Sequence, residues 1–151
     1  MDRNDILLLE ALQQDSSRSI AELAELAGVS PSACHRRIKA LEAAGTITGY
    51  AAQIDPHQLG LKLQAFVEIT LTSQSREAMD RFEAAAVQMS DILDCHLMSG
   101  NADYLLRVAA RDLDQYDRIH RDCLARLPGV SAMRSAFAIR RIKRWSGYPV
   151  R

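Results

Sequence analysis

Residues 19–45 read SIAELAELAGVSPSACHRRIKALEAAG, and this stretch decides the fold of the first part of the chain. Ser19 and Glu22 have the spacing of a capping box, in which each side chain bonds to a backbone N–H group at the start of a helix. Gly28 suits the left-handed position that ends a helix. The dipeptide Ser30-Pro31 supplies the N-cap and the first residue of another helix. Two helices separated by so short a break predict a helix-turn-helix.

The second of these helices has an apolar side and a cationic side. Its apolar residues Cys34, Ile38 and Leu41 repeat at spacings of four and three, which places them on one face. The N-terminal half of such a helix enters the major groove of DNA. The candidate DNA-binding residues are Ser30, Ser32, His35, Arg36, Arg37 and Lys39.

These candidates divide into two roles. Ser32, His35 and Arg36 are assigned to base edges, since arginine can bond to both O6 and N7 of guanine. Arg37 and Lys39 are assigned to phosphates, which fix the position of a protein on DNA without reading its sequence. The alternative interpretation is an ordinary solvated helix face. Cys34 is read as a small core residue, with a redox sensor as the alternative.

The rest of the first domain is helical up to a β-prone segment. Residues 5–14 carry a helical stripe of apolar side chains, and residues 46–54 are β-prone, with a turn at Gly49. Asp55-Pro56 and Gly60 are typical of a linker. We therefore expect three parts, with these limits: a helix-turn-helix DNA-binding domain over 1–54, a linker over 55–62, and a second domain over 63–151, whose role follows from the resemblance described below.

The second domain alternates strands and helices in the order β-α-β-β-α-β. The strands are expected at 63–72, 92–98, 104–109 and 130–142, and the helices at 75–89 and 112–127. This order fits a four-stranded antiparallel sheet with both helices on one face, the ferredoxin-like arrangement. The predicted fold class is α+β: an N-terminal helix-turn-helix, winged-helix-like domain followed by a C-terminal ferredoxin-like βαββαβ domain.

Composition narrows the classes of function. Hydrophobic residues make up 48% and charged residues 25%, which favours a folded chain, and no apolar run is long enough to span a membrane. The acidic start does not resemble a signal peptide, so a cytoplasmic protein is expected. Three cysteines without a CxxC spacing argue against a disulfide framework and a zinc site. We find no catalytic elbow, HExxH sequence or phosphate-binding loop, and we expect no catalytic residue, no metal and no cofactor.

Charge is the least favourable feature for a DNA-binding protein. The formal net charge is zero, and residues 1–60 hold five basic and eight acidic residues. Affinity for phosphate must therefore come from a local patch. Residues 140–151 hold five basic residues and no acid. The part from Arg140 to Arg144 is interpreted as a solvated strand end, with a contact to DNA as the alternative.

Three stretches resemble the Lrp/AsnC, or feast/famine, family of transcription regulators. They are VSPSACHRRIKALEAAGTI at 29–47, CHLMSGNADYLL at 95–106 and LPGV at 127–130. The three stretches occur in the expected order, and the resemblance extends over nearly the whole chain. The resemblance implies a sequence-specific DNA-binding regulator that forms a homodimer through its C-terminal sheet. Many family members assemble four such dimers into an octamer.

The resemblance also implies a small-molecule effector, an amino acid or a related compound, bound in the C-terminal domain. The implied effector-binding residues are Gly100, Asn101, Ala102, Asp103 and Tyr104, with Ser131 and Met133 as weaker candidates. Backbone N–H groups of the turn could bind a carboxylate, and Asp103 could bind an ammonium group. The alternative for Asp103 is a turn residue that bonds to its own backbone.

Two other classes of function compete with a DNA-binding regulator. Ferredoxin-like domains also host enzymes. The N-terminal helices could instead bind a protein, which the acidic balance of residues 1–60 favours slightly. Cys95 and His96 could suggest a metal or a nucleophile, but neighbours on a strand point to opposite faces, so both are read as structural. The identity of the effector, the operator sequence and the direction of regulation do not follow from the sequence.

Overall fold

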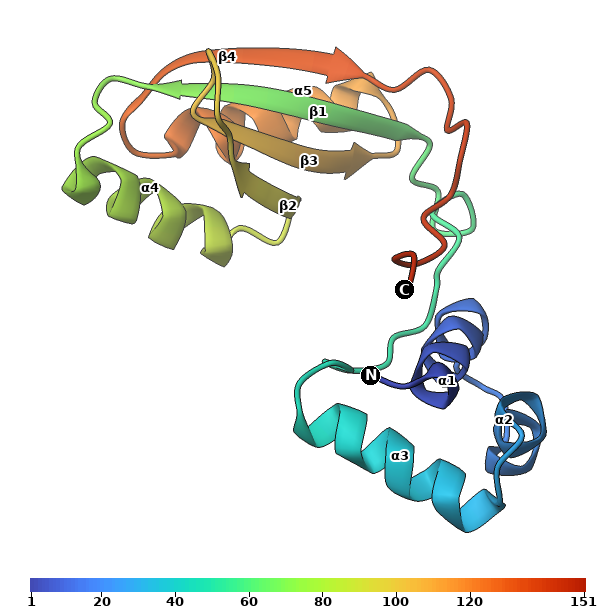
Figure 1. Ribbon diagram of the computed structural model, residues 1–151. Coiled ribbons are helices and arrows are strands. Elements are labelled where there is room, and N and C mark those ends of the chain that lie inside the picture. The colour runs from blue at the N-terminus through green and yellow to red at the C-terminus, as the bar shows by residue number, and fades with distance from the viewer. The chain divides into compact units, whose positions relative to one another are not determined.

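The computed structural model describes all residues from Met1 to Arg151 and divides them into two compact units. The first unit contains Met1–Gln53 together with Ile142–Arg151, and the second contains Ile54–Arg141. Figure 1 shows the helical unit and the unit that carries the sheet. The last ten residues belong to the first unit, whereas the sequence-based limits assign them to the second domain.

Three helices form the first unit: α1 (Arg3–Gln14), α2 (Ile20–Ala27) and α3 (Pro31–Ala43). The predicted capping box of Ser19 and Glu22 is present, and Gly28 ends α2 with a φ of 65°. Ser30 caps α3, with Pro31 in the first turn. The helices meet around a small core made of Leu8, Ala11, Leu23, Ala24, Ala27, Cys34 and Ile38. The burial of Cys34 supports its reading as a core residue.

The β-prone segment after α3 does not form a strand, so this part of the prediction is wrong. Thr46 and Ile47 donate their N–H groups to the carbonyl of Leu41, and residues 48–54 have no strand partner. A single extended segment is not stable as a strand without a neighbour to pair with. The structure accordingly shows a helix-turn-helix without the paired strands of a wing.

The second unit is a four-stranded antiparallel sheet in the order β2-β3-β1-β4, with helices packed on one face. Its elements are β1 (Leu63–Leu71), α4 (Arg76–Gln88), β2 (Ile92–Leu97), β3 (Tyr104–Ala110), α5 (Leu113–Asp122), the short 3₁₀ helix η1 (Leu124–Arg126) and β4 (Val130–Phe137). The α+β class and the βαββαβ order are as predicted.

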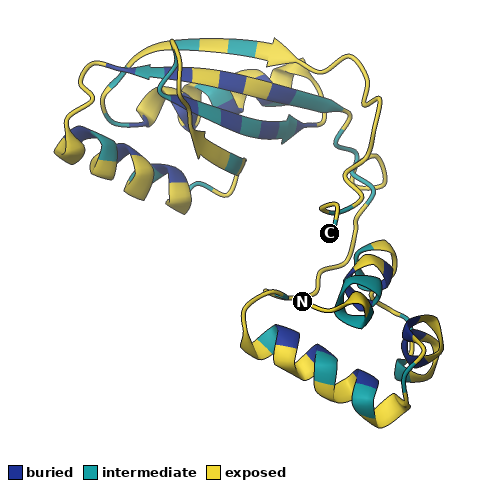
Figure 2. Ribbon diagram, in the orientation of Figure 1, coloured by how far each residue is buried: buried dark blue, intermediate teal, exposed yellow.

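The two central strands alternate between buried and more exposed side chains, as Figure 2 shows for β1 and β3. The buried set includes Val67, Ile69, Leu106 and Val108, which pack against α4 and α5 in one core. The opposite face carries Phe66, whose exposed fraction is 38%. One face of the sheet therefore lacks a covering layer within this chain.

The last strand is shorter than predicted, ending at Phe137 instead of Ile142. β4 pairs only with β1, and Phe137 lies opposite Ala65, close to the start of β1 at Leu63. Beyond this point β4 has little neighbouring strand left to pair with. The second predicted helix also ends early: α5 stops at Asp122, and a 3₁₀ turn precedes Leu127.

Candidate nucleic-acid interface and effector site

The outward face of α3 presents most of the candidate DNA-binding residues to solvent. Ser30, Ser32, His35, Arg36 and Lys39 are exposed, while Cys34, Ile38 and Leu41 hold the opposite face in the protein. Ser30 uses its hydroxyl to accept from the N–H of Ala33, so its side chain is occupied by capping. A stable seam on one face and free polar groups on the other is the geometry that a reading helix requires.

The three basic residues of α3 differ in their partners. Lys39 pairs with Glu42 at 2.7 Å, and Glu42 also accepts from the hydroxyl of Tyr50 at 3.0 Å. The hydrogen bond from Lys39 is the main reason that the pKa of Glu42 lies below its usual value. Arg36 forms no ion pair within the chain. Arg36 is thus the cation of α3 that is free to bind an external group.

Arg37 is tied to the start of α1. Its Nη1 lies 2.7 Å from a carboxylate oxygen of Asp2 and 2.9 Å from one of Asp5. The hydrogen bond to Asp5 is the largest of the causes that raise the pKa of Arg37. Sequence reasoning missed this contact because the two acids lie about thirty residues away. The assignment of Arg37 to phosphate stays a prediction. Because both carboxylates lie at Nη1, a phosphate would have to bind at Nη2.

Asp103 lies beside the C-terminal end of β1 and is held there by several hydrogen bonds. Its carboxylate accepts from the backbone N–H of Leu71 at 2.7 Å and from the side-chain amide of Gln74 at 3.3 Å. Its own N–H donates to the carbonyl of Ile69 at 2.8 Å, and its carbonyl accepts from the N–H of Met98 at 2.9 Å. Asp103 therefore fastens the turn between β2 and β3 to β1.

The other candidate effector residues gather around the same end of β1. Ile69 lies opposite Tyr104 on one side and Met133 on the other. Ser131 donates its hydroxyl to the carbonyl of Thr70 at 3.0 Å. Gly100, Asn101 and Ala102 form the adjoining turn, in which Gly100 and Asn101 are exposed. The structure brings these seven residues into one region of the second unit.

Tyr104 is buried and therefore differs from an open ligand contact. Its exposed fraction is 1%, and its hydroxyl donates to Glu83 of α4 at 2.7 Å. Burial raises the pKa of Tyr104 well above its usual value, and the hydrogen bond to Glu83 adds to this effect. The hydroxyl stays protonated and connects β3 to α4. The contribution of Glu83 was not anticipated, because no local pattern pairs it with a tyrosine in β3.

Cys95 and His96 lie on opposite faces of β2, as expected for neighbours on a strand. Cys95 is opposite the buried Leu106, and His96 is opposite Leu105. Although Cys95 is exposed, partial desolvation of its thiol by neighbouring atoms is the main cause of its raised pKa, so the thiolate is disfavoured. No group of three or more histidine, cysteine, aspartate or glutamate side chains in the chain could hold a metal ion.

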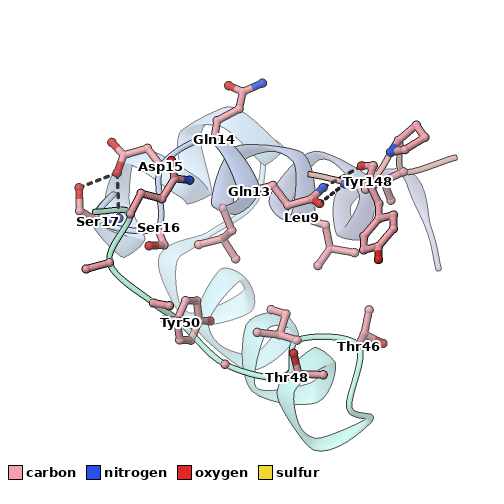
Figure 3. A pocket seen from close by; sticks show the side chains of 18 of the residues that line it. Leu9, Gln13, Gln14, Asp15, Ser16, Ser17, Thr46, Thr48, Tyr50 and Tyr148 are labelled. Atoms are coloured by element: carbon pink, nitrogen blue, oxygen red, sulfur yellow. Dashed lines mark hydrogen bonds between the residues drawn. The ribbon is translucent and has the colours of Figure 1, made fainter. Parts of the chain in front are cut away.

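A groove of about 1070 Å³ lies beside α1 in the first unit. Figure 3 shows Leu9 and Gln13 of α1 on one side and Thr46, Thr48 and Tyr50 on the other. The C-terminal residues 148–151 complete its lining. None of the candidate effector residues lines this groove.

Two models of known protein families match this chain. Residues 1–42 match the model of the AsnC-type helix-turn-helix domain, and residues 64–147 match that of the Lrp/AsnC ligand binding domain. The chain belongs to the Lrp/AsnC family. It is thus a DNA-binding transcription regulator with a helix-turn-helix domain and a ligand-binding domain.

Several relatives of this Lrp/AsnC regulator are similar over most of their length. The leucine-responsive regulatory protein of Salmonella typhimurium is 38% identical over 95% of this chain and 87% of its own length. An uncharacterised HTH-type transcriptional regulator of Sinorhizobium fredii is 45% identical over 76% of this chain and 91% of its own.

Solved structures show the same fold. A transcriptional regulator from Neisseria meningitidis, in complex with L-Met, gives a TM-score of 0.93 at 33% identity, covering 99% of this chain and 96% of that one. An AsnC family transcriptional regulator from Agrobacterium tumefaciens gives a TM-score of 0.93 at 36% identity, covering 99% and 97%. Separately, no helix of the Lrp/AsnC regulator described here is long and apolar enough to cross a membrane.

Proposed function

We propose that the protein reads its operator with the N-terminal half of α3 in the major groove of double-stranded DNA. The observation that carries this proposal is the position of Arg36, which is exposed, unpaired and opposite the seam formed by Cys34, Ile38 and Leu41. Arg36 bonds to base edges together with Ser32 and His35. Lys39 and Arg37 contact phosphate, Lys39 by exchanging Glu42 for the DNA backbone, while Ser30 caps the helix that enters the groove.

The effector is an amino acid or a closely related compound that binds beside the turn between β2 and β3. Support comes from the clustering of Asp103, Ser131 and Met133 at the end of β1 and from the L-Met complex of the Neisseria neighbour. Exposed backbone N–H groups around Gly100 bind the carboxylate of the effector. The protein regulates transcription without catalysing a reaction and needs no cofactor.

Assembly of several copies provides the affinity for DNA that a single helix-turn-helix of this charge lacks. Residues 1–60 hold five basic and eight acidic residues, so one copy binds DNA weakly. The uncovered face of the sheet, which includes Phe66, pairs with the same face of a second copy to form a homodimer. Four dimers form an octamer that presents several reading helices to one DNA molecule in the cytoplasm.

Gel shifts against genomic fragments at two salt concentrations test the proposed function. A DNA-binding regulator retains a small set of fragments at the higher salt, whereas unspecific electrostatic binding is lost. Enrichment of no fragment would contradict the operator-reading role and would favour the interpretation of α1–α3 as a protein-binding module. A thermal-shift screen of the twenty standard amino acids, beginning with L-methionine, identifies the effector, because only a ligand of the native state raises the melting temperature.

A further inference from the structure

The C-terminal segment is fastened to α1 by a reciprocal pair of hydrogen bonds. The side-chain amide of Gln13 donates to the carbonyl of Tyr148 at 3.0 Å and accepts from the N–H of Tyr148 at 2.6 Å. Figure 3 shows both bonds. The side chain of Gln13 thus satisfies both backbone groups of one residue, as a neighbouring strand would do.

Gly147 permits this close approach. Its φ is +100°, a conformation that side-chain-bearing residues rarely adopt. A Cβ atom at this position would also collide with the side chain of Gln13. Any other residue at position 147 would have to strain its backbone and displace Gln13, so the segment depends on glycine here.

Charge favours the docked position. The rings of Trp145 and Tyr148 meet edge to face with centroids 4.7 Å apart, but both residues belong to the segment and are 66% and 74% exposed, so this pair does not hold the segment on α1. Residues 142–151 hold three basic residues and no acid, whereas residues 1–53 hold five basic and seven acidic residues. The segment therefore carries positive charge to a unit that is acidic without it.

The docked segment is also a second connection between the units: the chain joins it to β4, and hydrogen bonds join it to α1. β4 ends at Phe137, and only residues 138–141 separate this strand from the segment that belongs to the first unit. The segment first contacts α1 at Gly147 and Tyr148, so residues 138–146 lie between β4 and this contact, and these nine residues extend to at most roughly 32 Å. The other route is the chain that leads from Gln53 to β1.

We propose that Ile142–Arg151 is a regulatory strap: it docks on α1 through Gln13 and couples the state of the ligand-binding unit to the DNA-binding unit. This inference rests on the proposed function, since it assigns a route to the influence of the effector on DNA. When the strap is docked, the DNA-binding unit is held at both ends and loses part of its orientational freedom. When the strap is released, only the linker holds the unit, and the coupling between the two sites weakens.

Hydrogen–deuterium exchange of the full-length protein tests the docking. Gln13→Ala removes the contact from the side of α1, and Gly147→Ala removes it from the side of the strap. Gln14→Ala and Ser146→Ala are matched controls, because both residues are exposed neighbours without a hydrogen bond to the other segment. The Tyr148 amide should exchange about fivefold faster, or more, in both contact variants and at the wild-type rate in both controls. Equal exchange in all five proteins would overturn the docking.

Operator affinity in the presence and absence of the effector tests the coupling. The duplex comes from in vitro selection with the wild-type protein, and L-methionine is the first effector tested, followed by the other standard amino acids. In the wild-type protein, the effector changes the dissociation constant for the operator by a certain factor. This factor should be smaller by about fivefold or more in both contact variants, while the affinity for the effector itself is unchanged. An unchanged factor in Gln13→Ala and Gly147→Ala would overturn the regulatory role of the strap.

The two experiments also separate failure of the strap from failure of the proposed function. If the wild-type protein selects no duplex, the operator-reading role is contradicted, and the coupling through the strap falls with it. If the wild-type protein binds its duplex and responds to an amino acid while both contact variants respond equally well, only the strap is contradicted.

Discussion

The carboxylate of Asp103 accepts a hydrogen bond from the backbone N–H of Leu71 at 2.7 Å, which joins the turn after β2 to the end of β1. The contact lies where the pairing of β1 with β4 shifts its register between Thr70 and Leu71. The same carboxylate oxygen accepts from Gln74 at 3.3 Å. Asp103 therefore shapes the proposed effector site whether or not it touches the effector.

Substitution of Asp103 separates a shaping role from a charge role. Asp103→Asn keeps an oxygen that can accept from Leu71 but removes the negative charge, whereas Asp103→Ala removes both. If the residue mainly shapes the turn, Asp103→Asn should bind the effector within about threefold of the wild type, and Asp103→Ala should bind at least about tenfold more weakly, the loss expected for one hydrogen bond to a charged group. Titration calorimetry measures both affinities. Equal loss in the two variants would instead indicate a direct bond to an ammonium group.

Arg36→Ala should weaken binding to the selected operator by about 1–3 kcal/mol, because a bidentate contact to guanine is lost. The effect on an unrelated duplex should be smaller. Fluorescence anisotropy with the two duplexes measures this difference. Arg76→Ala, at an exposed position of α4, controls for the loss of one positive charge. Equal losses on both duplexes would contradict the assignment of Arg36 to a base edge.

Lys39→Ala should reduce the steepness with which affinity falls as salt rises, by about one unit on a double logarithmic plot. The reduction should be similar for specific and unrelated DNA, since phosphates carry no sequence information. The variant Glu42→Gln tests the same residue in the opposite direction. Because this substitution frees Lys39 from its ion pair, it should strengthen binding to both duplexes. A slope that Lys39→Ala leaves unaltered would mean that this residue does not touch phosphate.

Arg37→Ala should lower the melting temperature of the first unit, because it removes the tie between α3 and the start of α1. Asp5→Asn should have a similar but smaller effect, since Asp2 would still hold the guanidinium group. The double variant should lose less than the sum of the two single losses if the contact is real. Circular dichroism melts measure these effects, and strictly additive losses would contradict the contact.

The first unit should lose stability in acid. Hydrogen bonds from backbone N–H groups lower the pKa of Asp2 below its usual 3.8 and that of Glu22 below its usual 4.5. A lowered pKa stabilises the folded state at pH values above the unfolded-state pKa, and this contribution disappears as the pH falls through the folded-state value. Melting temperatures between pH 6 and 3 should therefore fall, and Glu22→Gln should flatten the curve. An unchanged curve in that variant would contradict the role of the capping box.

Local signals in the sequence were sufficient for the helices of the first unit. Ser19, Glu22 and Gly28 act within a few residues of their own position, so their caps could be read without a structure. The strand ends could not be read in this way. β4 ends at Phe137 because of where β1 begins, and this depends on the register between two distant segments.

In the candidate sites, too, local features could be predicted from the sequence, whereas contacts between distant segments could not. The seam of α3 follows from periodicity, and the effector region follows from the resemblance to a family. The partners of Arg37 and Tyr104 lie in other elements, at Asp5 and Glu83, and no spacing rule connects such pairs. The contact between Gln13 and Tyr148 joins residues 135 positions apart, and no local sequence pattern relates the two.

The narrow seam of α3 has a consequence for the evolution of this regulator. Only Cys34, Ile38 and Leu41 of this helix are buried. The side chains at positions 32, 35 and 36 are exposed and do not pack in the core. Mutations there can alter the preferred operator while the fold keeps its stability. A duplicated gene could thus acquire new target promoters in single steps, each tolerated by the scaffold.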